Sequence, residues 1–289
     1  MRIPIFKKML LSTVLGVAGL AASGAASAVV VGGINFGALG ATSHLETATL
    51  AETFVGSVGD KLQGYGLITT VNGNTNYCAS GTCSLYYYFH DYTVSQFSPL
   101  ALRFTGGTVD VYFSNGAPLN LLGQNSVQNV STITAMNPWV RFKGASFNDP
   151  LMNFLLGAGS QTLNGFGSLI GNSLNFTGAG QLNVDTSGAF GMANVASYFD
   201  VNTAGNGFGG FSDVILSSSS SNFELNPFDV SSGLANGCKT GGAAVGAWCL
   251  QGTLSIRGNT NVVPEPASLA LVGLGLFGAA FARRRAAKA

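Results

Sequence analysis

The chain has 289 residues, a formal net charge of +1, and only 9% charged side chains against 46% hydrophobic ones. Soluble domains average about 25% charged residues, so this chain is strongly depleted in charge. Charge-driven disorder is excluded because it needs low hydrophobicity with high net charge. The lack of a basic stripe argues against nucleic-acid binding, which depends on neutralising phosphates.

The first 28 residues have the features of a secretory signal peptide. Basic residues open the chain, and an uncharged apolar run from Met9 to Leu20 follows. Small residues then lead to Ala26-Ser27-Ala28, an A-x-A cleavage signature, so we expect the mature chain to begin at Val29. The alternative is an uncleaved membrane anchor, but the apolar run is short for a span and the cleavage signature follows it directly.

Residues 29–262 form the segment that we expect to fold as one exported domain. The segment carries eleven acidic residues and six basic ones, for a net charge of −5, and the basic residues are Lys61, Arg103, Arg141, Lys143, Lys239 and Arg257. With so few charges, electrostatic steering contributes little. The surface must instead be covered by Ser, Thr, Asn, Gln and Gly.

Most of this segment has the residue pattern of β-strands, namely β-branched and aromatic runs separated by Gly, Asn and Pro. The predicted strands are Lys61–Val71, Ser84–Phe97, Trp139–Phe142, Leu174–Val184, Asp213–Leu216, Phe223–Phe228 and Gly252–Arg257. Leu102–Thr105 and Thr108–Phe113 flank Gly106-Gly107, which predicts a hairpin with a two-glycine turn. One helix is expected at 191–199, where Met192, Val195, Ala196 and Phe199 share a face. Short strands with frequent turns predict a mainly β fold, a β-sandwich or jelly-roll-like domain.

All four cysteines lie in this segment, as Cys78 with Cys83 and Cys238 with Cys249. An even count in an exported chain favours disulfides, and local pairing is the simplest of the three connectivities. Zinc is the rival interpretation, but it needs ligand pairs two to four residues apart with His or Cys partners. The spacings do not fit, and His44 and His90 are each far from a second partner in the sequence.

The residues that would carry catalysis do not form a recognisable set, so no catalytic residue is assigned. Nucleophilic hydrolysis needs a base beside its nucleophile, and the chain has two histidines and no G-x-S-x-G elbow. His90 precedes Asp91 in a predicted strand, and adjacent strand residues point to opposite faces, so we expect no direct pair between them. A glycosidase needs two opposed carboxylates, and nothing in the sequence selects two of the eleven.

One loop has the composition of a calcium site. Asp200, Asn202 and Asn206 place oxygen side chains at alternating positions, and Asp213 follows shortly after. Calcium takes six to eight oxygen ligands from loops of this kind, although the glycine and the closing glutamate of an EF-hand are missing. The alternative is an Asx-rich turn whose side chains satisfy its own backbone. Calcium is the one cofactor that the sequence raises.

A dense aromatic run gives a candidate contact surface for a glycan or a protein partner. Its tyrosines are Tyr86, Tyr87, Tyr88 and Tyr92. In a strand, Tyr86, Tyr88 and His90 share one face, while Tyr87, Phe89 and Asp91 share the other. One face must be core, and we expect the other to be a row of exposed rings. Core filling is the alternative explanation, because aromatic residues dominate cores as well.

The last 27 residues have three parts in a fixed order. Val263-Pro264-Glu265-Pro266 is a rigid, extended segment, an uncharged run from Ser268 to Ala282 follows, and Arg283, Arg284 and Arg285 come after it. A helix of the uncharged run would be about 22 Å long, which is marginal for a membrane span. The basic residues place the end of the chain in the cytoplasm by the positive-inside rule.

This arrangement, from Val263 to Arg285, resembles the PEP-CTERM sorting signal of Gram-negative bacteria. The resemblance implies that an exosortase recognises the segment, that the inner membrane holds the chain only transiently through its C-terminal helix, and that the product reaches the cell surface or the extracellular matrix. Genomes with this system usually also make exopolysaccharide. The chain thus divides into a signal peptide (1–28), an exported β-rich domain (29–262) and a sorting segment (263–289).

The middle of the chain also resembles the flocculation-associated subgroup of PEP-CTERM proteins. The shared stretches are Gly64-Tyr65-Gly66, the Asn-Gly turn with its two-cysteine loop, the aromatic strand after it, Ala196–Asn202 and Ser217–Phe223. The resemblance implies a surface protein that cells need in order to aggregate within exopolysaccharide. We therefore expect a non-enzymatic protein that adheres to polysaccharide or to itself. The alternatives are a matrix-targeted carbohydrate-active hydrolase and a structural protein that self-assembles through strand edges.

Overall fold

The computed structural model describes residues 28–38, 42–168, 175–205, 207, 210–229, 238 and 243–260, and all structural statements concern these residues. The strands are β1 (Ala28–Val31), β2 (Ile34–Ala38), β3 (Ser43–Thr53), β4 (Lys61–Ile68), β5 (Thr70–Val71), β6 (Ser84–Phe97), β7 (Ala101–Ser114), β8 (Asn137–Gly144), β9 (Leu163–Ser168), β10 (Asn175–Val184), β11 (Ala204–Gly205), β12 (Phe211–Ser212), β13 (Val214–Leu225) and β14 (Trp248–Gly258). The helices are α2 (Ser126–Thr134), α3 (Pro150–Leu156) and α4 (Ala193–Phe199), with a single 3₁₀ turn η1 (Leu121–Gly123).

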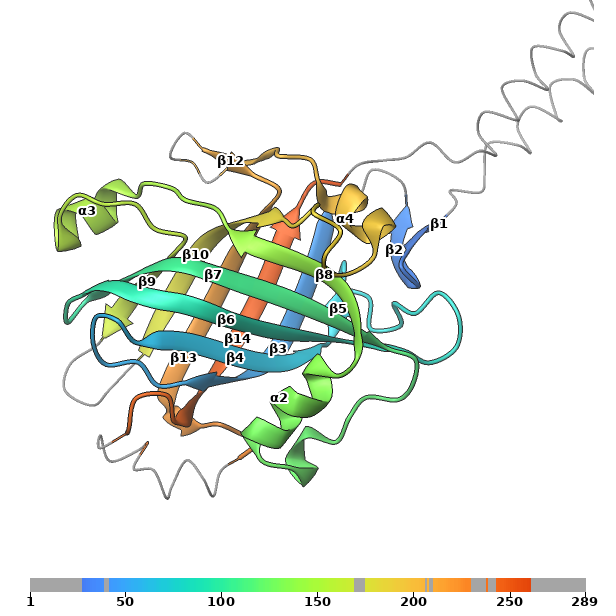
Figure 1. The fold of residues 1–289 in the computed structure, drawn as a ribbon, viewed down its shortest axis with the longest axis horizontal. Helices are drawn as coiled ribbons and strands as arrows, with labels where there is room; N and C mark the ends of the chain where they lie inside the picture. Colours follow the sequence, from blue (N-terminus) through green and yellow to red (C-terminus); the bar gives the residue numbers. More distant parts are fainter. Residues whose placement is uncertain are drawn as a thin grey trace, which may run out of the picture.

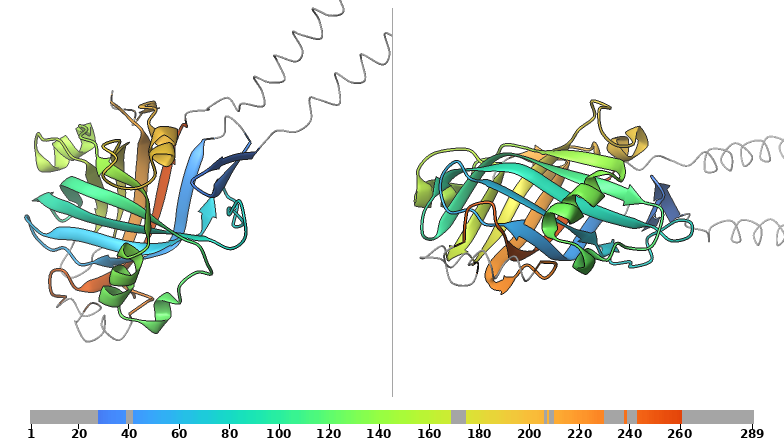
Figure 2. Two further views of the ribbon diagram at one scale, coloured as in Figure 1. Left: turned by 45° about the vertical axis from the view of Figure 1, so that its right-hand side comes forward. Right: turned by 60° about the horizontal axis from the view of Figure 1, so that its bottom comes forward.

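Eight antiparallel strands form one closed, barrel-like sheet (Figure 1). The order is β13-β14-β3-β4-β6-β7-β8-β10, and β10 pairs back onto β13 to close it. β8 and β9 divide the space between β7 and β10, because β8 pairs with one end of each strand and β9 with the other. In Figure 1, β4, β6, β7 and β8 form a front wall, while β3, β14 and β13 form a back wall that crosses it steeply. Figure 2 shows the same curvature from two further sides.

The mainly β prediction is confirmed, whereas the predicted β-sandwich or jelly roll is wrong. A sandwich has two separate sheets, but here β3 pairs with β4 and β10 pairs with β13, so both walls belong to one closed sheet. The alternation of inward apolar and outward polar residues is the same in both architectures. The alternation therefore predicts which residues of each strand face inward, but not whether the first and last strands of the sheet pair with each other.

Alternate residues of every strand fill the interior of the closed sheet. Leu45, Tyr87, Phe104, Phe142 and Leu216 are among the fully buried members of this main core. A second, smaller cluster lies on the outside of the sheet, where η1 and α2 cover part of the front wall; its buried members are Ala51, Tyr65, Tyr86, Tyr112, Leu121 and Ile133. Both faces of β6 are therefore covered along its first half.

The predicted hairpin at Gly106-Gly107 is wrong, because β7 runs straight through both glycines as one 14-residue strand. The turn that connects β7 to its partner β6 lies earlier in the chain, at residues 98–100. Both glycines have positive φ, 72° and 89°. A Cβ on Gly107 would overlap the ring of Tyr92, which packs against the bare backbone. The glycine pair thus marks a close approach inside a strand, the other structure that such pairs favour.

Several other expectations are confirmed. β6 has the predicted bounds, and both disulfides form between local partners, Cys78 with Cys83 and Cys238 with Cys249. α4 buries Val195, Ala196 and Phe199, as its helical spacing predicts. β13 differs from prediction because it continues through five serines to Leu225 without a break. β1, β2, β3, β9, α2 and α3 were not predicted.

The predicted signal peptide, apart from Ala28, and the whole sorting segment lie outside the described residues. Within the described part of the chain, no helix combines the length and the apolar character that a membrane crossing requires.

We predict that Gly107→Ala lowers the free energy of unfolding by about 2 kcal/mol or more, because alanine at positive φ is strained and its methyl group displaces the Tyr92 ring. Urea unfolding of the variant beside the wild type measures this. Equal midpoints and equal slopes would contradict the packing of Tyr92 on Gly107.

Tyr92→Phe is the matched control. The Tyr92 hydroxyl is buried, and none of the described residues offers it a hydrogen bond. Removing it should leave stability unchanged or raise it by up to about 1 kcal/mol, since an unsatisfied buried hydroxyl costs free energy.

Candidate functional site

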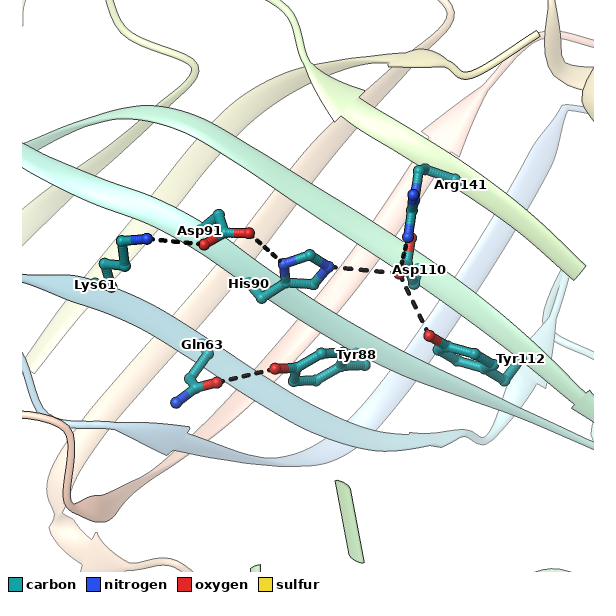
Figure 3. A network of polar contacts seen from close by, with 8 residues as sticks. All are labelled: Lys61, Gln63, Tyr88, His90, Asp91, Asp110, Tyr112 and Arg141. Carbon is teal, nitrogen blue, oxygen red and sulfur yellow. Dashed lines mark hydrogen bonds and ion pairs between the residues drawn. The ribbon is translucent and has the colours of Figure 1, made fainter. Parts of the chain in front are cut away.

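Eight side chains form a network of polar contacts on the outer face of the front wall, in two hydrogen-bonded groups that meet where Tyr88 stacks on His90 (Figure 3). They come from four neighbouring strands: Lys61 and Gln63 from β4, Tyr88, His90 and Asp91 from β6, Asp110 and Tyr112 from β7, and Arg141 from β8. We call this set the front-wall network. It gathers three of the basic groups of a charge-poor domain in one place.

Asp110 is the buried centre of the front-wall network. Arg141 lies directly opposite it on β8 and grips its carboxylate with two bonds, Nε to Oδ1 at 2.6 Å and Nη2 to Oδ2 at 2.7 Å. Nε2 of His90 and the hydroxyl of Tyr112 each lie 3.4 Å from Oδ2. Burial raises the pKa of Asp110, but the hydrogen bonds and charges of Arg141 and His90 outweigh it, and the net pKa is lowered. The carboxyl is therefore ionised at neutral pH.

His90 and Asp91 form a direct pair, contrary to the expectation from strand alternation. Nδ1 of His90 lies 2.7 Å from Oδ2 of Asp91. The reason is a bulge, in which His90 and Asp91 together face Gln63 of β4. Asp91 has φ of 60°, so its side chain turns to the same face as His90. Lys61 holds the other carboxylate oxygen of Asp91 at 3.1 Å.

Both ring nitrogens of His90 therefore face carboxylates. Burial lowers the pKa of His90, but the hydrogen bonds and charges of Asp110 and Asp91 raise it more, and the net pKa is raised. A protonated imidazole that donates from both nitrogens has no lone pair with which to accept a proton. This geometry suits a fixed positive charge better than a general base.

Lys61 and Asp91 are the most accessible of the ion-paired side chains in the network, at 65% and 56% exposed, whereas His90 and Arg141 are 22% and 28% exposed. Tyr88 stacks on His90 with ring centroids 4.9 Å apart, and its hydroxyl donates to Oε1 of Gln63 at 3.0 Å. The Arg141 guanidinium lies 4.1 Å from the centroid of the Phe190 ring. Ring stacking and a cation–π contact thus add to the hydrogen bonds and ion pairs that hold the network together.

The tyrosines proposed as a contact surface do not form an exposed row. Tyr86, Tyr87 and Tyr92 are fully buried, and Tyr88 alone of the four is half-buried. Tyr86 lies on the predicted outer face, but its hydroxyl accepts the N–H of Leu119, whose segment covers it. Tyr92 lies inside because the bulge at His90 and Asp91 shifts the alternation by one residue.

The predicted calcium loop is held by its own backbone bonds where the structure describes it. Asp213 is buried, and its carboxylate accepts the N–H groups of Val184, Val201 and Asn202 at 2.7–3.0 Å. Asp200 ends α4, and Asn206 lies outside the described residues. The described residues hold no group of three or more His, Cys, Asp or Glu side chains placed for a metal ion. Calcium at this loop stays a prediction.

Glu52 is a buried acid inside the closed sheet. It points inward from β3 and is hydrogen-bonded to the hydroxyl of Ser220 on β13. Burial raises its pKa to about 8, and the Ser220 bond lowers it only in part. A protonated acid of this kind is a feature of some glycosidases. The hydrogen-bond partner of Glu52, however, is the Ser220 hydroxyl and not a second carboxyl group.

Sequence reasoning named His90 and Asp91 but not the partners that define the network. Asp110 and Tyr112 are two residues apart in one strand and therefore share a face, which is the signal that the sequence carries. Their pairing with Arg141 depends on the register between β7 and β8, which lie more than twenty residues apart.

Comparison with known proteins identifies the C-terminal segment. Residues 262–285 match the family model described as the PEP-CTERM protein-sorting motif. No curated protein and no solved structure matches the chain. A motif of this kind indicates an exported protein that an exosortase processes for delivery to the cell surface, consistent with a Gram-negative envelope. The predicted sorting signal is confirmed, and the match does not extend to the β-rich domain.

We predict that the stability difference between the wild type and His90→Gln depends on pH. The folded pKa of His90 is raised above 6.5, so its stabilisation is complete below pH 6.5 and is lost as the pH rises through the folded pKa. The difference should be about 1 kcal/mol near pH 5.5 and smaller near pH 8.5. Urea unfolding at both values tests this, and a difference that widens with pH would contradict it.

A second pH prediction concerns Glu52→Gln. The folded pKa of about 8 lies above the unfolded value of 4.5, so the wild type loses stability as the pH rises through this window. The variant has no acid to ionise and should be the more stable protein at pH 8, by about 4 kcal/mol, with the difference shrinking to below about 1 kcal/mol at pH 5. Thermal unfolding of both proteins across this range measures it. A gap that stays the same between pH 5 and pH 8 would show that Glu52 is already ionised in the fold across this range.

Proposed function

We propose that this protein is a cell-surface or matrix protein that acts by adhesion within exopolysaccharide, as in flocculation or biofilm formation, and not by catalysis. The observation that carries the proposal is the sorting motif at 262–285, which indicates delivery to the cell surface. Exosortase is the partner that this motif implies. The polysaccharide is the partner that the location favours.

The geometry of the domain supports adhesion over the hydrolase alternative. The polar side chains of the front-wall network are tied up in ion pairs with one another on an outer wall of the sheet. When His90 is protonated it faces both Asp91 and Asp110, and in that state it cannot serve as a base. Glu52, the acid with a raised pKa, is sealed inside the packed sheet.

The closure of the sheet is also relevant to the alternative function, in which copies of the protein self-assemble through strand edges. Assembly through strand edges needs a strand with unpaired backbone groups. Among the described residues, each of the eight closing strands has a neighbour on both sides, because β10 and β13 pair. A contact on the walls of the closed sheet would therefore be made through side chains, while the two-stranded β1–β2 and β11–β12 sheets are separate from it.

Replacing Pro264, Glu265 and Pro266 with alanine tests destination and role together. We expect the wild type to be shortened and found in the matrix, and the triple variant to stay at full length in the inner membrane, because the exosortase no longer recognises it. Mass and location are measured by fractionation, and culture aggregation is scored beside them. Lys288→Ala, which lies beyond the matched residues, is the control and should behave as the wild type.

The outcomes separate the two parts of the proposal. If the wild type also remains full-length in the inner membrane, the sorting interpretation is wrong. If the wild type is processed and delivered but cells lacking the protein aggregate as well as cells that make it, sorting stands and the adhesive role is rejected.

A further inference from the structure

The back wall carries a row of outward polar side chains, most of them hydroxyl residues, that runs across three strands. Glu46 on β3 lies opposite Ser255 on β14, which lies opposite Ser217 on β13. One step along, Thr253 pairs with Ser219, and their hydroxyls are 2.8 Å apart. Four of these residues carry hydroxyl groups and form what we call the hydroxyl track: Ser217, Ser219, Thr253 and Ser255. Together with Glu46 they line a shallow hollow of about 200 Å³.

A larger hollow of about 410 Å³ continues the track towards β11. His44, Arg257, Asn259 and Thr203 are among its lining residues, as is Gly205. Phe211, opposite Gly205 in the β11–β12 pair, is 67% exposed. Its ring lies 3.5 Å from where a Cβ on Gly205 would be. An exposed phenyl ring thus lies beside a hollow lined by amide, guanidinium and hydroxyl groups.

The charges of this region offset one another. Arg257 donates from Nε to Nε2 of His44 at 2.8 Å, and its Nη2 lies 3.6 Å from Glu46. Burial lowers the pKa of His44; Glu46 raises it less, and Arg257 lowers it further. His44 is therefore neutral at pH 7, and Arg257 and Glu46 cancel. A surface of near-zero charge that is rich in hydroxyl groups complements an uncharged polar partner, not an anion.

We propose that this back-wall surface binds a neutral polysaccharide chain, with one sugar ring against Phe211 over the larger hollow and the following units along the hydroxyl track. A sugar ring has an apolar face of C–H groups that packs on an aromatic ring, and hydroxyl edges that both donate and accept hydrogen bonds. Asn259, Arg257 and the serines supply both kinds of partner. Thr253 to Arg257 spans roughly 13 Å of strand, which suits a chain segment better than a single ring.

This inference rests on the proposed function, since it names the class of glycan that the adhesive protein would bind. It does not use the front-wall network, which lies on a different wall of the sheet. Loss of one surface therefore leaves the other in place.

Affinity electrophoresis of the chain purified from the cells that make it tests the proposal. The probes are hydroxyethylcellulose, dextran and the neutral fraction of the polysaccharide from the same cells, with alginate as the acidic comparison. We expect at least one neutral probe to retard the wild type, and Phe211→Ala to weaken that binding on the order of tenfold. Phe154→Ala is the matched control, because Phe154 is an exposed phenylalanine (85%) on α3, away from the track, and should bind as the wild type.

Three results would overturn the proposal: no retardation by any neutral probe, equal weakening in the two phenylalanine variants, or stronger binding to alginate than to the neutral probes. Circular dichroism confirms that both variants fold. If the wild type binds no neutral probe but is still processed and still promotes aggregation, this inference fails while the proposed function stands. If it binds a neutral probe but aggregation does not depend on it, the adhesive role fails while the binding surface stands.

Discussion

The pairing of β10 with β13 is the interaction on which the rest of this structure depends. It runs over eight consecutive residue pairs, from Asn175 with Ser221 to Leu182 with Val214, and it turns an open sheet into a closed one. An eight-stranded closed sheet has an interior just wide enough for side chains to fill. Because that interior is packed with aromatic and aliphatic groups, a large partner can contact only the outer walls and the ends.

The shortage of charge has a direct structural consequence on those walls. A domain with few charged residues must cover most of its surface with hydroxyl and amide side chains. Its few charged side chains lie in small groups in which opposite charges are paired. Asp110 with Arg141 and His90 is one such group, and Glu46 with His44 and Arg257 is another. The buried guanidinium of Arg103 is also hydrogen-bonded, but to neutral oxygens instead of a carboxylate. It donates to the side chains of Gln96, Asn153 and Gln161 and to the carbonyl of Gly157. Each group is locally satisfied, which leaves the surrounding wall close to neutral.

Local patterns in the sequence predicted what is local in the structure. The strand at 84–97, the helix ending at Phe199 and the two short disulfide loops depend on residues close together in the chain. The closure of the sheet could not be predicted, because a strand that ends a sandwich and one that closes a barrel have the same alternation. The bulge at His90 and Asp91 was missed because positive φ at an aspartate leaves no mark in the alternation. That one residue reverses the face of Tyr92 and creates the His90–Asp91 pair, so both errors at the candidate site have a single cause.

The position of the sorting motif along the chain ties the back wall to processing. β14 ends at Gly258, Asn259 lines the larger hollow, and the matched motif begins three residues later at 262. Three residues span at most about 11 Å of chain, so the hollow and the start of the sorting segment lie at the same end of the domain. Asn259 of the larger hollow is thus three residues from the matched motif, whereas the front-wall network ends at Arg141, more than a hundred residues earlier. Of the two polar surfaces, the one on the back wall is therefore the one that is directly continuous in the sequence with the sorting segment.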